Sequence, residues 1–325
     1  IVAAPLFFGI RVVLHFGPTN LADYQKPYLS IPEQINRLES RGMQISNQQK
    51  AERYLRHIGY YRLSAYWYPC REVDTSSGNP PHVRLDTFKT STRFADIVDL
   101  YVFDKRLRLL FLDAIERIEV SLRTAIALEI GATSPWAHLD PKTYRKNFTS
   151  RQVSQSQSQF GKWKDKLSTQ QAMSKESFVT HFSKKYPQSE LPIWIAIELW
   201  DFGMLSKLLS GLDPKHSRAI SSSYGVAQRP DLVPAWVRSL NIIRNFCAHH
   251  ARLWNRISPF EVKSVQGDGV SSLDHLRRND VDRKRTYAAA AVMQFLMKEI
   301  NPDSSWSDRL SELVGTFPST DHFKL

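Results

Sequence analysis

One stretch constrains the fold more than any other: residues 94–131 keep an apolar stripe of helical period from end to end. Such a stripe predicts an unusually long amphipathic helix that Thr92 caps and Gly131 ends. A break near 103–105 is one expectation, because the stretch exceeds the ordinary length of soluble helices. The stripe consists of Phe94, Ile97, Val98, Tyr101, Leu107, Leu110, Phe111, Ala114, Ile115, Ile118, Leu122, Ala125 and Ile126.

The rest of the chain also has mainly helical patterns, so we expect an all-α fold. A loop with a short hairpin is expected over 71–92, where turn residues gather. Neither G-x-G-x-x-G nor a P-loop occurs, which makes a nucleotide-binding α/β fold improbable. Further helices are predicted at 30–42, 46–59, 191–212, 234–256, 283–301 and 304–315.

We expect three parts along the chain. Residues 1–25 are interpreted as a leader that is poorly ordered or not part of the native start, because their apolar run is too short and too polar to span a membrane. Residues 26–90 form an N-terminal helical region. Residues 91–325 form the main domain, with a mobile polar insert near 145–190 that contains the sequence SQSQSQ.

Charge and cysteine content limit the classes of function. The formal net charge of +12 favours polyanionic partners such as nucleic acid. Two cysteines exclude a disulfide scaffold and any site built from cysteines alone. We expect a soluble cytoplasmic protein that needs no cofactor and does not bind a membrane.

The most informative window lies between Asp231 and Glu261 and contains no carboxylate. An ordinary exposed helix would pair its basic residues with acidic ones four positions away. A helix through 234–256 would place several polar residues on one stripe and bury the opposite face. That predicted stripe consists of Arg238, Asn245, His249, Arg252 and Arg256, with Arg244 adjoining it.

These residue types suit cleavage of RNA without a metal ion. Histidine serves as general base or acid near neutral pH, so His249 could take a proton from a 2′-hydroxyl group. Arg244 could meet the negative charge of the phosphorane-like transition state. Asn245 stands one helical turn before His249 and could orient its ring, while His250 is a second candidate histidine.

Structural explanations compete with this interpretation. An arginine followed by a histidine at this spacing is common by chance, and a basic helix could instead pack against acidic segments. Glu116 and Glu119 could supply that acid, or Glu119 could pair with Arg123 on its own helix. The aromatic residues at 60–68 could stack on RNA bases, although such a cluster is more often part of a core.

A longer string makes the functional interpretation stronger. The sequence RNFCAHHARLWNR (244–256) resembles the R-N-x-x-A-H-H-x-R-L-W-N-R block of the Abi-like family, the AbiD/AbiF group of abortive-infection proteins. Blocks at 49–67, 100–126 and 191–209 match the family in the same order. The resemblance covers roughly 26–256, and the family belongs to the HEPN superfamily.

The resemblance implies a HEPN-like helical bundle with additional N-terminal helices, which acts as a metal-independent endoribonuclease in antiphage defence or as a toxin. Arg244 and His249 match the catalytic pair, with Asn245 and His250 beside them. The partners it implies are RNA, a second copy of the chain, and an antitoxin that is a protein or a small RNA. We expect RNA contacts from Arg238, Arg252, Arg256, Arg117 and Arg123. The alternative functions are a non-catalytic RNA-binding module and a regulatory protein whose basic face docks an acidic partner.

Overall fold

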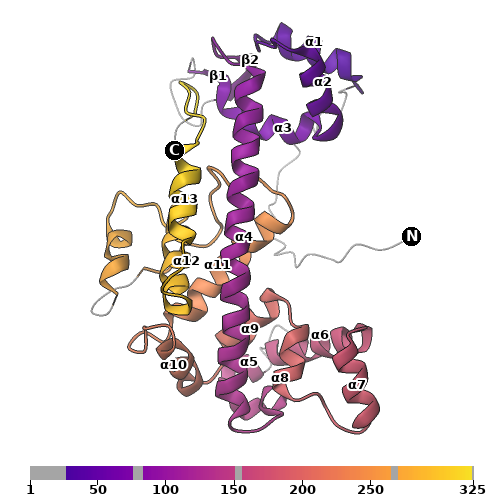
Figure 1. Ribbon diagram of the computed structural model, residues 1–325, viewed down its shortest axis with the longest axis vertical. Coiled ribbons are helices and arrows are strands. Elements are labelled where there is room, and N and C mark those ends of the chain that lie inside the picture. The colour runs from indigo at the N-terminus through magenta and orange to yellow at the C-terminus, as the bar shows by residue number, and fades with distance from the viewer. Residues whose placement is uncertain (1–26, 76–82, 151–155, 265–269, 324–325) are drawn as a thin grey trace.

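The computed structural model describes residues 27–75, 83–150, 156–264 and 270–323. Its spine is α4 (Phe94–Gly131), which continues without a break for 38 residues and so spans roughly 57 Å. Figure 1 shows α4 running through the whole length of the molecule. The predicted long helix is therefore confirmed, without the break near 103–105. Its N-cap is Arg93 rather than Thr92, and the Arg93 side chain pairs with Asp96 at 2.7 Å.

The N-terminal elements gather around the start of α4, at the top of Figure 1. The predicted hairpin is present as an antiparallel pair of strands, with an irregular register between Arg71 and Val73. Within the described residues, these two strands make up the sheet. Asn47 caps the second helix, because its side chain accepts the backbone N–H of Lys50 at 2.8 Å. The elements are α1 (Ile31–Ser40), α2 (Gln48–His57), α3 (Tyr60–Trp67), η1 (Tyr68–Cys70), β1 (Arg71–Asp74) and β2 (Val83–Phe88).

Helices occupy much of 145–190, where a loop was expected. Ser158, within the SQSQSQ sequence, caps α6 by accepting the backbone N–H of Gly161 at 3.0 Å. The helix then buries Phe160, Trp163 and Leu167, whose spacing is helical although the region is polar on average. The elements are η2 (Ala137–Leu139), η3 (Pro141–Thr143), α5 (Lys146–Thr149), α6 (Gln159–Met173) and α7 (Ser177–Lys185).

The apolar stretch predicted as a helix at 191–212 divides into short helices, with a joint at Asp201. Asp201 breaks the helix because its carboxylate caps the following one, accepting the backbone N–H of Met204 at 2.8 Å. The elements are α8 (Ile193–Ala196), η4 (Ile197–Leu199), α9 (Phe202–Gly211) and α10 (Pro214–Ser222).

The C-terminal helices pack along α4 and complete one continuous hydrophobic core. The indole N–H of Trp306 donates to the carbonyl of Leu110 at 2.8 Å, and Arg309 pairs with Asp113 at 2.6 Å. These contacts attach the end of the chain to the middle of α4. The elements are α11 (Leu232–Ala248), η5 (Ser271–Arg277), α12 (Thr286–Ile300) and α13 (Trp306–Gly315).

The all-α class is thus confirmed. Within the described part of the chain, no helix is both long enough and apolar enough to cross a membrane. The expected leader at 1–25 lies outside the described residues.

Candidate active site

The predicted histidines lie at the end of α11 and not inside a longer helix. The N–H of His250 donates to the carbonyl of Cys247 at 3.1 Å, and that of Ala251 donates to Phe246 at 2.9 Å. His250 has a φ of 57°, in the left-handed region. This pair of bonds is a Schellman motif, in which glycine usually occupies the position of His250. The expected helix through 256 is therefore wrong by eight residues at its end.

A fully buried carboxylate explains why the chain leaves the helix here. Asp104 of α4 accepts the backbone N–H of Leu253 at 3.0 Å and that of Trp254 at 2.6 Å. It also accepts the hydroxyl of Tyr66 at 2.7 Å and pairs with Arg108, which is itself buried. Burial, and then the negative charge of Asp104, raise the pKa of Tyr66, so its hydroxyl remains a donor. A buried charge requires such a set of partners.

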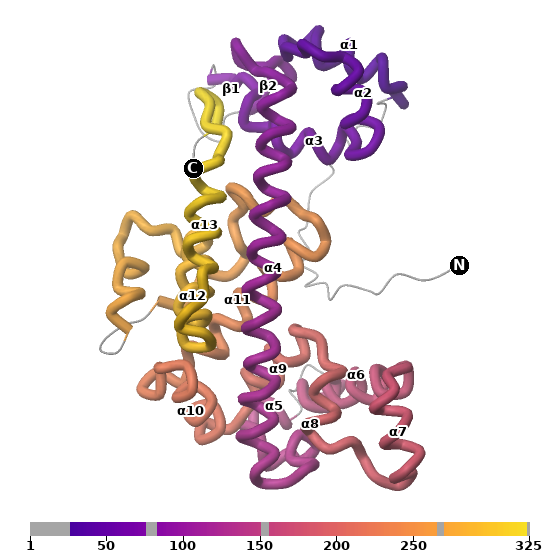
Figure 2. The backbone as a smooth tube through the Cα atoms, viewed as in Figure 1, coloured from indigo at the N-terminus to yellow at the C-terminus, as the bar shows by residue number. Residues whose placement is uncertain are grey.

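Helix α3 holds the outer side of the same segment. Arg62 donates to the carbonyl of His250 at 2.7 Å, and Arg252 donates to the carbonyl of Ala65. Figure 2 shows the chain after α11 passing toward α3. The backbone of the two histidines is therefore fixed from two directions. The side chains of His249 and His250 remain exposed and make no hydrogen bond to any described residue.

Arg244 lies on a different side of α11, facing acidic residues. It is close enough to Glu119 and Asp201 that its charge lowers the pKa of both carboxyl groups. Glu119 is bound to Arg123 at 2.7 Å, so the predicted pair within α4 is present. Burial nevertheless leaves the pKa of Glu119 above its usual value. Among the described residues Arg244 has no ion pair or hydrogen bond to its side chain, which leaves its guanidinium donors free.

The segment that follows the histidines runs back beside α11. The guanidinium of Arg256 stacks 3.9 Å from the ring centre of Phe246 on the helix. In the reverse arrangement, Arg238 on the helix stacks 4.0 Å from the ring centre of Phe260 in the segment. Further along, the indole N–H of Trp236 donates to the carbonyl of Lys263 at 2.8 Å. Two Arg–Phe stacks and a hydrogen bond thus attach this segment to α11.

The structure does not bring all of the predicted residues together. His249, Asn245 and Arg238 share one face of α11, because spacings of four and seven residues return to the same side of a helix. The side chain of Asn245 makes no hydrogen bond to a described residue, so its orienting role stays a prediction. Arg252 and Arg256 lie beyond the end of the helix. The prediction of a single stripe that contains all of these arginines is therefore wrong.

Arg117 and Arg123 form ion pairs with acidic residues of their own helix, α4. Arg117 pairs with Asp113 at 3.1 Å. Arg123 pairs with Glu119 and also donates to the carbonyl of Trp200 at 2.7 Å. Both arginines therefore have structural partners, and a contact with RNA would compete with them.

Sequence reasoning missed the residues that position the histidine segment. Asp104 and Arg108 occupy buried positions within the apolar stripe of α4, four residues apart. A complementary charged pair inside an otherwise apolar helical stripe was the available signal, because such groups are buried only with partners. Arg62 carried no comparable signal. Of the aromatic cluster, Tyr66 and Trp67 are core residues, whereas Tyr61 is 91% exposed.

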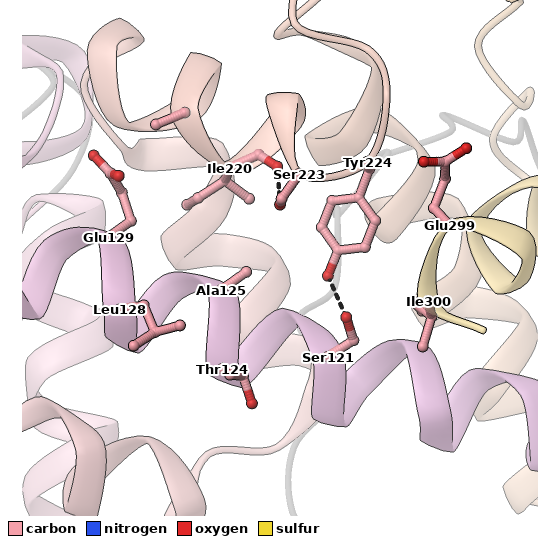
Figure 3. A pocket seen from close by; sticks show the side chains of 11 residues that line it. Ser121, Thr124, Ala125, Leu128, Glu129, Ile220, Ser223, Tyr224, Glu299 and Ile300 are labelled. Carbon is pink, nitrogen blue, oxygen red and sulfur yellow. Dashed lines mark hydrogen bonds between the residues drawn. The ribbon is translucent and has the colours of Figure 1, made fainter. Parts of the chain in front are cut away.

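A hollow on α4 shows where the surface is unsuited to RNA. It has a volume of about 510 Å³, and its lining, within the described part of the chain, includes Glu129 and Glu299 but no lysine or arginine. Figure 3 shows Tyr224 reaching over it to Ser121, whose hydroxyl lies 2.8 Å from the tyrosine hydroxyl. Of the two carboxylates, that of Glu129 has a partner, since it lies 2.8 Å from the ring of His216. An RNA strand would meet the negative charge of Glu299 here, which has no ion pair among the described residues.

No three histidine, cysteine, aspartate or glutamate side chains of the described residues are grouped to hold a metal ion. Both cysteines are buried, and burial raises the pKa of Cys247 to about 12, so its thiol is not a nucleophile.

Comparison with known proteins adds a family match. A family model described as Abi-like protein matches residues 53–255, which include α3, α4 and the whole of α11. The matched region ends at Asn255, just after the backbone N–H groups that Asp104 binds. Comparisons with curated proteins and with solved structures each give no match.

Proposed function

The chain belongs to the Abi-like protein family, whose name refers to abortive infection, and from this premise we propose that it is a metal-independent endoribonuclease of the HEPN type that acts in antiphage defence or as a toxin. The observation that carries the proposal is the histidine segment. Its backbone is anchored by Asp104 and Arg62, while both imidazoles face solvent beside a basic helix. A rigid backbone under exposed titratable groups is the arrangement that positions a general base.

In the proposed reaction His249 takes the proton of the 2′-hydroxyl, and the 2′-oxygen then attacks the adjacent phosphorus. The bond from phosphorus to the 5′-oxygen breaks, and a second histidine protonates the departing oxygen. The products are a 2′,3′-cyclic phosphate and a 5′-hydroxyl. Arg244 stabilises the negative charge that accumulates on the non-bridging oxygens, because its donors are free of a local ion pair.

The second histidine has two possible sources in this scheme. One is His250, which follows directly in sequence. The other is a second copy of the chain, and we favour it, because Arg244 and His249 are five residues apart and point about 140° apart around a helix. A two-fold pairing of two motif segments would bring both sets to one phosphate.

Replacement of the two motif residues tests the proposal. His249→Ala should lower the rate of RNA cleavage in EDTA about 10²–10⁴-fold, because it removes a proton transfer. Arg244→Gln should lower the rate while leaving the protein folded. Arg106→Gln, an exposed arginine of α4, is the matched control. Unchanged cleavage by His249→Ala would contradict the proposed base, and a loss confined to His250→Ala would move the assignment by one residue.

RNA binding without cleavage would instead favour the non-catalytic module. Sequencing of RNA ends from cells that express wild type or His249→Ala separates these functions. The endoribonuclease predicts new 5′-hydroxyl ends with the wild type alone. The binding module predicts the same ends with both proteins.

A further inference from the structure

A cavity of about 520 Å³ lies beside the first half of α11. Its wall comes from α11 with the residue before it, from the segment that returns along α11, and from single residues before α5, at the end of α9 and before α12. Its charged lining residues are Arg145, Arg238, Lys263, Arg283, Asp231 and Glu261. Four positive and two negative side chains therefore surround it.

Two of the positive charges are already neutralised. Lys263 lies 2.6 Å from Asp231, and Arg283 pairs with Glu261. Arg229 also binds Asp231, at 3.1 Å. The hydrogen bond from Arg229, followed by that from Lys263, holds the pKa of Asp231 well below its usual value, so this carboxylate stays charged. The positive charges that remain without an acidic partner among the described residues are those of Arg145 and Arg238.

Each of these two guanidinium groups is held in place by a single contact, which leaves most of its N–H groups available. Arg238 stacks 4.0 Å from the ring centre of Phe260, which fixes its plane but uses none of its N–H groups. Arg145 donates its Nε–H to the carbonyl of Leu212 at 2.8 Å, which leaves its terminal N–H groups free. Two orientated guanidinium groups with spare donors on one cavity are suited to a phosphate group, which accepts paired hydrogen bonds from arginine.

The cavity and the histidine segment share one face of α11. Arg238 precedes His249 by 11 residues, which returns to within about 20° of the same direction at a distance of roughly 16 Å along the axis. Asn245 lies between them on this face. A strand that is held at His249 can therefore follow the helix surface to the cavity within a few nucleotides.

We propose that this cavity binds a backbone phosphate of a single RNA strand, a few nucleotides from the bond at His249. The proposal rests on the proposed function for its account of what His249 does to the strand. A single strand fits better than a duplex, because a duplex presents its phosphates on a convex surface, whereas here the arginines line a hollow. The preferred substrates are therefore strands long enough to reach both His249 and the cavity.

Binding of an RNA that cannot be cut tests the cavity separately from the chemistry. A short 2′-O-methyl oligoribonucleotide lacks the attacking hydroxyl, so its fluorescence anisotropy reports affinity alone. The double variant Arg145→Gln/Arg238→Gln should weaken its binding roughly ten- to a hundredfold, the value of losing charge-assisted hydrogen bonds. It should also reduce the slope of log K against log salt concentration by about 0.7 for each lost phosphate contact.

A charge-matched variant controls for the general loss of two positive charges. Arg106→Gln/Arg218→Gln removes two exposed arginines, on α4 and α10, outside the cavity lining, and should change the affinity less than threefold or so. Equal weakening by both double variants would overturn the cavity assignment. The variant Arg145→Lys/Arg238→Lys keeps the charge without the paired donors, and it should recover only part of the affinity.

Substrate length gives an independent measurement on the active protein. A dinucleotide spans the bond at His249 but is too short to reach Arg238. The cavity variant should therefore raise the KM for a longer strand much more than the KM for a dinucleotide. An equal effect on both lengths would overturn the proposal, as would displacement of the oligonucleotide by an equal concentration of a nucleoside monophosphate. If His249→Ala cuts normally while the cavity variant loses affinity, the proposed chemistry fails and the phosphate site stands.

Discussion

The carboxylate of Asp104, in the first third of α4, accepts the backbone N–H of Trp254 at 2.6 Å across 150 residues of sequence. This bond, with its neighbour to Leu253, fixes the direction in which the chain leaves α11. The position of both histidines therefore depends on a residue that lies in a different helix and has no exposed surface.

Replacement of Asp104 should unfold or strongly destabilise the protein. Asp104→Asn leaves Arg108 buried without its counter-ion and replaces an acceptor oxygen by an amide that donates. Removal of one partner from a buried ion pair costs about 3–5 kcal/mol. Chemical denaturation measures this loss. Asp99→Asn, at an exposed position of the same helix, is the control and should change the free energy of unfolding by less than about 0.5 kcal/mol.

Glycine should be the best residue at position 250 for stability. His250 has a φ of 57°, and the left-handed region costs a residue with a side chain about 1–2 kcal/mol. His250→Gly should therefore give a free energy of unfolding about 1 kcal/mol higher than His250→Ala. Urea denaturation of the two variants compares them directly. An equally stable pair would show that the Schellman geometry does not persist in solution.

Stability should fall as the pH is lowered from 7 to 5, and His138 should account for part of that loss. Its two ring nitrogens are buried without a hydrogen-bond partner among the described residues, and burial, followed by the charge of Lys164, lowers its pKa to about 4. The unfolded chain takes up a proton near pH 6.5, whereas the folded chain does not, so the folded state loses about 2 kcal/mol over this interval.

The variant His138→Phe should remove that part of the pH dependence. Phenylalanine has no titratable group and can keep the ring contact with Trp200, whose centre lies 6.0 Å from that of His138. The measurement is the free energy of unfolding of both proteins at pH 7 and pH 5. A difference between wild type and variant that is the same at both pH values would contradict the assignment.

Arg252 should matter for folding and not for the salt dependence of RNA binding. It is half-buried and donates to the carbonyl of Ala65, and burial lowers its pKa. Arg252→Gln should cost about 1.5–3 kcal/mol, the value of a hydrogen bond from a charged group. The salt slope of RNA binding should stay unchanged in the folded fraction. A slope lower by about 0.7 would instead identify Arg252 as a phosphate contact.

Activity should depend on protein concentration if the site is completed by a second copy. Specific activity should fall on dilution through the dissociation range of the dimer, because a monomer would retain one motif segment only. Light scattering at the same concentrations gives the mass. Full specific activity in a species of 37.5 kDa would contradict the two-copy site and leave His250 as the second histidine.

The sequence predicted those elements whose limits are set by their own residues. The periodic stripe of α4 gave both of its ends, because an amphipathic face and a terminal Gly131 are local signals. The end of α11 was missed since no glycine marks the turn at His250, and the apolar and polar positions continue at helical spacing beyond it. What stops the helix is a carboxylate 150 residues earlier in the chain.

The site shows the same division. The residues of the motif could be identified from the sequence because they follow one another closely along the chain. Arg244 is half-exposed and His249 and His250 are exposed, which a site that binds a substrate requires. The partners of Arg238 and Arg256 were not, because each stacks on a phenylalanine that only the return of the chain brings close. Sequence spacing predicts neighbours within a helix and not those across a loop.

The unbroken α4 also determines when the site can exist during synthesis. The donors that Asp104 needs come 150 residues later, and the indole of Trp306 that binds Leu110 later still. A ribosome that has made α4 therefore carries a helix whose buried charges and apolar stripe await almost all of the remaining chain. The histidine segment cannot be held in its final position until Leu253 and Trp254 have emerged to meet Asp104. On the proposed function, we therefore expect a growing chain to be inactive toward RNA until these residues have emerged from the ribosome.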